Sequence, residues 1–110
     1  PFDPNFYLYP DASMEILSKC DMGIDFIFVG HSHYPFIAKL GHGQLVNVGS
    51  VGQSRISGGL ASWCLVDINR GTLDLQSTYY DTESLLRLVD QYDPDIDYLS
   101  KVLKRGVYEE

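Results

Sequence analysis

With 110 residues, 45% of them hydrophobic, the chain can bury a core but is long enough for only one domain. The net charge is −7 and the lysines and arginines form no cluster, which argues against a nucleic-acid backbone or an anionic membrane as the partner. If the substrate is a phosphate, a bound cation rather than a basic patch is expected to neutralise it.

The compartment is inferred from the cysteines and from the absence of targeting signals. Cys20 and Cys64 belong to no C-x-x-C pair, which favours two free buried thiols over one disulfide. No apolar run approaches the roughly 20 residues of a membrane span, and there is no signal-peptide pattern. These features predict a cytoplasmic protein that does not bind membranes. The proline-rich opening PFDPNFYLYPD, which has no initiator Met, suggests a fragment of a longer chain.

The first expected elements are a short helix and a strand. Apolar residues recur at helical spacing over 14–20, with Asp11 as a candidate N-cap and Gly23 as the stop. The run FIFV at 26–29 is continuously apolar, which predicts a strand buried on both faces. A helix followed by such a strand is typical of an α/β fold.

Two hairpins are expected next. FIAKL (36–40) and QLVNV (44–48) flank Gly-His-Gly, and ASWCLVDI (61–68) and TLDLQSTYY (72–80) flank Asn-Arg-Gly. The Gly/Ser-rich loop GSVGQSRISGG (49–59) lies between them and has a length typical of functional or mobile loops. In the last strand, three alternating residues are expected on the dry face: Leu73, Leu75 and Tyr79.

From Asp81 onward the pattern is helical. It predicts one helix that stops before Pro94 and a last helix closed by Gly106. The expected apolar faces are Leu85, Leu86, Leu88 and Val89, then Ile96, Leu99, Val102 and Leu103. The remaining aspartates predict a solvated acidic surface: Asp90, Asp93, Asp95 and Asp97.

His31 and His33 follow the first predicted strand, where α/β sheets place their ligands. Two imidazoles one residue apart can converge on one cation or diverge to two, and Gly30 and Pro35 shape the turn that carries them. The alternative is a pair of loop histidines hydrogen-bonded to carbonyl groups; the H-x-H spacing at a strand end favours metal ligands. His42 lies in the hairpin turn and is expected to be solvated.

Two ligands do not make a complete metal site. A catalytic zinc needs about three protein ligands plus water, and no other residue has ligand spacing relative to His31 and His33. Either residues outside this chain complete the site, or a metal is held weakly.

The motifs VGHSHYPF and LVNVGSVGQSR resemble the last conserved block of the calcineurin-like metallophosphoesterases. In that family the block reads roughly G-H-T-H-x-P, followed by an Asn-Pro-Gly-Ser-Val-Gly loop. The chain looks most like small bacterial and archaeal members related to diadenosine-tetraphosphatase-like phosphoesterases, over roughly residues 1–80. The resemblance implies that residues 1–110 are the C-terminal part of a four-layer α-β-β-α sandwich, with two C-terminal helices.

The resemblance also implies a reaction. His31 and His33 would bind different cations of a centre with two divalent transition metals (Mn, Fe, Zn or Ni), and a metal-activated hydroxide would hydrolyse a phosphomonoester or phosphodiester. Asn47, Ser50 and Arg55 are weaker candidates for holding the site or contacting a small phosphate-ester substrate, and turn and loop chemistry explains them equally well.

The chain departs from the family pattern in two ways. Val48 and Ser54 stand where prolines are frequent, which predicts a looser loop, and Ser32 replaces the usual Thr. The earlier blocks Asp-x-His, Gly-Asp-x-x-Asp and Gly-Asn-His-Asp are absent, so the expected partner is a missing N-terminal half of the same domain. Alone, the chain is expected to be inactive, and an exposed sheet edge would favour self-association.

Two other functions compete with hydrolysis. The retromer subunit with this fold is a protein-interaction scaffold without catalysis, but a scaffold has no need of both histidines. A cupin-like single-metal barrel would place a glutamate a few residues after H-x-H, whereas here YPFIAKL follows.

Overall fold

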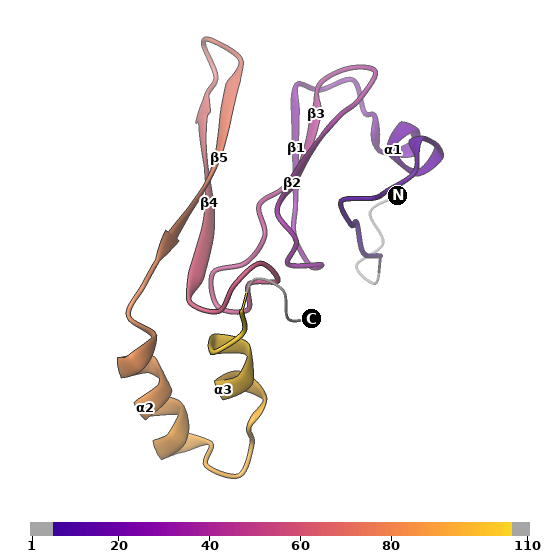
Figure 1. Cartoon of the computed structure of the whole chain (residues 1–110). Helices are drawn as coiled ribbons and strands as arrows, with labels where there is room; N and C mark the ends of the chain where they lie inside the picture. The colour runs from indigo at the N-terminus through magenta and orange to yellow at the C-terminus, as the bar shows by residue number, and fades with distance from the viewer. Residues whose placement is uncertain (1–5, 107–110) are drawn as a thin grey trace.

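The computed structural model describes residues 6–106, which form a mixed α/β structure (Figure 1). The elements in chain order are α1 (Met14–Cys20), β1 (Phe26–Val29), β2 (Phe36–Lys39), β3 (Gln44–Asn47), β4 (Leu60–Asp67), β5 (Thr72–Tyr79), α2 (Thr82–Tyr92) and α3 (Tyr98–Leu103). The predicted α/β class is therefore confirmed. None of the helices within the described range is long and apolar enough to cross a membrane.

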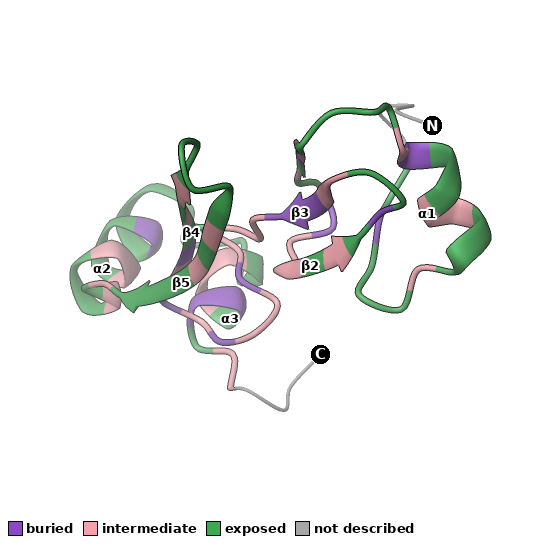
Figure 2. Cartoon of the chain, turned by 90° about the horizontal axis from the view of Figure 1, so that it is seen from above, coloured by how far each residue is buried: buried purple, intermediate pink, exposed green. Residues whose placement is uncertain are grey.

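The strands form two sheets, and both predicted hairpins are present. The first sheet has the order β1-β3-β2, with β3 parallel to β1 and antiparallel to β2; β4 and β5 form an antiparallel pair. The β2–β3 turn depends on Gly43, whose φ is +78° and where a Cβ atom would lie 2.1 Å from the Ile24 carbonyl oxygen. The three-stranded sheet lies between α1 and the β4–β5 hairpin (Figures 1 and 2).

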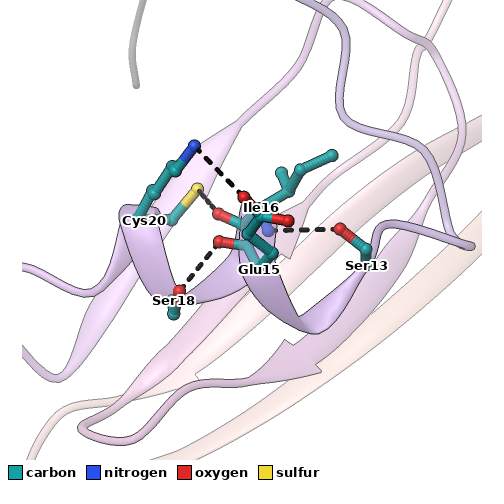
Figure 3. A network of polar contacts seen from close by, with 6 residues as sticks. Ser13, Glu15, Ile16, Ser18 and Cys20 are labelled. Carbon is teal, nitrogen blue, oxygen red and sulfur yellow. Dashed lines mark hydrogen bonds and ion pairs between the residues drawn. The ribbon is translucent and has the colours of Figure 1, made fainter.

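Helix α1 is capped by Ser13 and not by Asp11 as predicted (Figure 3). The Ser13 hydroxyl oxygen accepts a hydrogen bond from the Ile16 N–H at 3.2 Å, a reach that Asp11, two residues earlier, does not have. Lys19 and Glu15 form an exposed ion pair at 3.8 Å on the outer face of the helix. Local side-chain contacts therefore set the helix start, while burial of Cys20 anchors its end.

The main core lies between α1 and one face of the three-stranded sheet. Its buried members are Leu8, Cys20, Ile27, Leu40 and Leu45. The prediction that β1 is buried on both faces is wrong, because Phe28 is 48% exposed. In the described fold β1 is an edge strand, and alternate side chains of a strand point to opposite faces, so only Ile27 and Val29 reach this core.

The C-terminal helices make a smaller apolar contact near the start of β4. Four residues there are buried: Leu60, Val89, Val102 and Leu103. The predicted dry faces were too wide: Leu88 is 49% exposed and Tyr79 is 68% exposed. Ile96 is 58% exposed because α3 begins only at Tyr98. The four aspartates of this region are all exposed, as predicted.

Both cysteines are free thiols, but only Cys20 is fully buried, whereas Cys64 is half-buried. Burial raises the pKa of each thiol, and the nearby Asp74 carboxylate adds to the rise at Cys64. The prediction of two buried thiols is therefore correct for Cys20 and too strong for Cys64, which lies on β4 of the two-stranded sheet.

Candidate functional site

His31 and His33 line a pocket of about 520 Å³ just beyond the carboxyl end of β1. Segments that are far apart in the sequence meet there: the residues before α1, the β1–β2 connection, the 49–59 loop and both ends of α3. The other lining residues are Tyr7, Tyr9, Ser32, Tyr34, Gln53, Arg55, Tyr98 and Arg105.

The histidine turn has an unusual backbone. His31 has φ +73° and His33 has φ +64°, and no other non-glycine residue in the described part of the chain has a positive φ. Such conformations are uncommon for residues with a side chain and persist where the surroundings enforce them. Ser32, between the two histidines, is buried, and its N–H donates to the Gly30 carbonyl at 2.9 Å.

Asn47, at the end of β3, holds this turn from behind. Its side chain is fully buried, with 0% exposure. Its amide nitrogen lies 2.9 Å from the Ser32 hydroxyl, 3.2 Å from the Gly30 carbonyl and 3.3 Å from the Leu8 carbonyl. Its amide oxygen accepts the Gly49 N–H at 3.0 Å. Asn47 therefore joins the end of β1, the N-terminal segment and the 49–59 loop, and it does not line the pocket.

The other two weaker candidates lie in different places. The Ser50 hydroxyl accepts the Gln53 N–H at 2.9 Å, a turn contact, and Ser50 is not among the pocket residues. Arg55 does line the pocket. Its Nη2 donates to the Tyr34 hydroxyl at 3.1 Å, and its guanidinium carbon lies 5.2 Å from the centre of that ring.

Ser54 gives the loop contacts that a proline could not provide. It is 2% exposed, and its hydroxyl oxygen accepts the N–H groups of Ile56 and Ser57 at 3.1 and 3.2 Å. Serine in the place of proline predicted a looser loop, but the Ser54 hydroxyl forms two hydrogen bonds that close the local turn.

Arg105 is a pocket residue that the sequence did not reveal. It follows α3, its carbonyl accepts the Gly58 N–H at 2.7 Å, and its Nη1 donates to the Ser54 carbonyl at 3.1 Å. Two guanidinium groups therefore reach one pocket in a chain whose cations are dispersed in sequence. The sequence offered Arg55 as a candidate for contacting a phosphate ester, whereas the presence of Arg105 in the same pocket depends on long-range contacts that the sequence does not show.

Tyrosine side chains surround the histidines. The Tyr7 ring stacks on the His31 imidazole with centroids 3.9 Å apart and an angle of 21°. Tyr7 and Tyr9 are nearly parallel, at 6.0 Å and 12°, and Tyr9 meets Tyr34 edge-on at 5.7 Å. The tyrosines of the opening segment were a visible signal, but the sequence did not tell that they reach the histidines.

The described residues do not complete a metal site. Within residues 6–106, no group of three or more His, Cys, Asp or Glu side chains could hold a metal ion. His42 is exposed in the β2–β3 turn with its Nε2 3.1 Å from Asp25 Oδ1, which agrees with the expected turn role. His31 and His33 therefore supply at most two ligands, fewer than the roughly three that a catalytic zinc takes from protein.

The chain is similar to parts of two longer archaeal proteins. No protein-family model matches it. It is 33% identical over 90 residues to the uncharacterized protein MJ0912 of Methanocaldococcus jannaschii, a match that covers 68% of this chain and 35% of the relative. The crystal structure of the hypothetical protein PH1004 from Pyrococcus horikoshii OT3 matches with a TM-score of 0.77 and 20% identity, over 96% of this chain and 43% of that chain.

These matches show a shared fold over a part of larger proteins. The chain spans about a third of the curated relative's length and less than half of the solved structure. The α/β arrangement described above is therefore similar to that of a segment in a solved archaeal protein.

Proposed function

We propose that this chain is the C-terminal part of a metal-dependent phosphoesterase domain and contributes His31 and His33 to its metal centre. The observation that carries the proposal is the H-x-H turn: both histidines have positive φ, are backed by buried Asn47 and open into a pocket with two arginines. Strained backbone that the surroundings enforce is typical of functional sites.

The proposed reaction is hydrolysis of a phosphomonoester or phosphodiester. Imidazole suits Mn, Fe, Zn and Ni, and two such cations would supply the activated hydroxide. This chain's own part is to hold two metal ligands and to present Arg55 and Arg105 to the phosphate. The remaining ligands would come from outside residues 6–106, so the 110-residue chain by itself is expected to show negligible turnover.

The proposed architecture is the C-terminal part of a four-layer α-β-β-α sandwich. The position of the three-stranded sheet between α1 and the β4–β5 hairpin agrees with the order that this architecture would require (Figure 2). The exposed Trp63 and Leu65 on β4 are then the surface that a further layer would cover.

The proposed compartment is the cytoplasm, because free thiols favour a reducing environment.

Titration with Zn²⁺, followed through the histidine ring resonances in NMR spectra, tests the histidine assignment. We expect the resonances of His31 and His33 to shift, with those of His42 unchanged. His33→Ala should lower the apparent affinity by about tenfold, because one of two imidazole ligands is lost. His42→Ala is the matched control and should bind like the wild type; equal responses from all three histidines would contradict the proposal.

A protein-interaction scaffold without catalysis is the second candidate. The lack of a complete ligand group in the described residues and the exposed apolar side chains of the β4–β5 hairpin favour it: Trp63, Leu65 and Ile68. The same zinc titration separates the two candidates, because a scaffold needs no response at His31 or His33.

A further inference from the structure

We propose that the pocket binds a phosphate ester whose organic group is a flat aromatic ring, with the phosphate on Arg55 and Arg105 and the ring against Tyr9. The hydrolytic use of this ligand rests on the proposed function, but the binding itself requires neither a metal nor turnover.

The charge of the pocket favours an anion. The chain has 15 Asp and Glu residues and a net charge of −7, yet no carboxylate is among the described residues that line this pocket. Two arginines line it instead, together with His31 and His33. Guanidinium groups bind carboxylate and phosphate oxygens through paired, charge-assisted hydrogen bonds, and a phosphate monoester has a third terminal oxygen with which to contact a second arginine.

Arg105 is held in a position suited to this task. Its main chain is tied to Gly58 and its Nη1 to the Ser54 carbonyl, so its guanidinium is fixed at the pocket wall. A guanidinium has several N–H donors, and the Ser54 contact uses one of its nitrogen atoms. Because the Arg105 guanidinium is already held in place, less conformational entropy is lost when the ligand binds.

The tyrosines indicate the shape of the organic group. Tyr7, Tyr9 and Tyr98 all line the pocket and are 46%, 42% and 55% exposed. Tyr9 contacts two other tyrosines of the pocket, because it is nearly parallel to Tyr7 and edge-on to Tyr34. A flat aromatic ring packs on such surfaces by offset stacking or edge contact, whereas a puckered aliphatic ring has no π face and contacts them only through its C–H groups.

The size of the pocket agrees with a ligand of this class. Its volume of about 520 Å³ lies within the range of small-molecule sites and exceeds what a phosphate ion alone requires. A bare phosphate would contact the arginines but not the exposed ring of Tyr9. An aromatic ester would contact both the arginines and Tyr9.

The test compares phenyl phosphate, cyclohexyl phosphate and inorganic phosphate, titrated without metal into the 110-residue chain and followed by calorimetry and NMR. The titrations are made at an alkaline pH at which both esters are dianions, so that they carry the same charge and similar bulk but differ in flatness. We expect phenyl phosphate to bind roughly threefold to tenfold more tightly than cyclohexyl phosphate, with ring-current shifts at Tyr9.

Substitutions test separately which residues contact the aromatic ring and which contact the phosphate. Tyr9→Leu should abolish the preference for the phenyl ester, while Tyr9→Phe keeps it; Tyr79→Leu, an exposed tyrosine of β5 outside the pocket, is the matched control. Arg105→Gln should weaken both esters by about tenfold, and Arg105→Lys should restore part of the loss. Arg70→Gln, in the distant β4–β5 turn, should change neither.

Equal affinity for the two esters, a preference that survives Tyr9→Leu, or no binding of any of the three phosphates would overturn the inference. If Tyr9→Leu does not fold, the wild-type ester comparison and the tyrosine shifts decide. A phenyl preference without a zinc response at His31 and His33 would reject the proposed function alone. A zinc response without the preference would reject only this inference.

Discussion

The pocket has two walls that are built in different ways. The histidine wall, His31 and His33, comes from one turn and is held by a fully buried side chain, Asn47. The arginine wall, Arg55 and Arg105, joins a loop to the end of α3 through hydrogen bonds at Gly58 and Ser54. The two histidines come from a single turn that a buried side chain holds, whereas the two arginines come from segments that are far apart in the sequence.

Because different contacts hold the two walls, we expect a single substitution to disturb one wall and not the other. A change in the buried amide network should distort the histidine wall and leave the arginines in place. A steric clash between the 49–59 loop and α3 should separate the arginines and leave the histidine turn intact. Variants that affect one wall but not the other test whether the two walls are independent.

Asn47→Ala should have the largest effect. It removes the buried hydrogen bonds of the Asn47 amide to the Gly30 and Leu8 carbonyls and to the Ser32 hydroxyl, and it leaves the Gly49 N–H without this acceptor. We expect a loss of about 2–4 kcal/mol in the free energy of unfolding. Urea denaturation measures this loss. The Zn²⁺ response of His31 and His33 should weaken more than the binding of inorganic phosphate.

The matched control for this variant is Asn69→Ala, in the exposed β4–β5 turn. It should stay within about 0.5 kcal/mol of the wild type. A similar loss in both variants would mean that the Asn47 network does not hold the histidine wall.

Gly58→Ala should act on the arginine wall. A Cβ atom there would lie 2.2 Å from the Leu103 carbonyl oxygen, so α3 has to move and Arg105 with it. We expect a loss of roughly 1–3 kcal/mol in the free energy of unfolding, together with weaker binding of inorganic phosphate and an unchanged histidine response to Zn²⁺.

Gly52→Ala is the control in the same loop, because nothing lies within 4 Å of its added methyl group. It should leave stability and phosphate binding unchanged. If Gly58→Ala weakened the zinc response as much as phosphate binding, the two walls would be coupled after all.

The smallest effect is expected at Asp81, the N-cap of α2, which is the helix that precedes α3 in the chain. Its pKa lies below the ordinary 3.8 because the Ser84 hydroxyl and then the Ser84 N–H donate to its carboxylate. The folded-state pKa is lowered, so the stabilisation is present above pH 3.8 and is lost as the pH falls through the folded pKa.

Thermal unfolding of the wild type and Asp81→Asn at a series of acidic pH values measures this contribution. The difference in Tm should shrink as the pH falls, and Ser84→Ala should reduce it in part; Ser77→Ala, an exposed serine of β5, is the control. A difference that stays constant across the series would rule out the capping carboxylate as its source.

The sequence predicted local features well and long-range ones poorly. Helix, hairpin and turn positions follow from residue spacing and from turn residues such as Gly43, so they were readable. The sequence did not predict that Phe28, Leu88 and Tyr79 are exposed, because exposure depends on which other element covers each face. Ile96 was misplaced by the same reasoning, since helical spacing does not tell where α3 begins.

For the site, the sequence by itself determined the histidine turn: its two imidazoles, the preceding glycine and its place after a strand are all local. Only the tertiary structure decided that Arg105 and the opening tyrosines meet this turn, and that Asn47 supports it from behind. The physical reason is that a pocket is closed by contacts between residues remote in the chain, and these contacts leave no periodic pattern in the sequence.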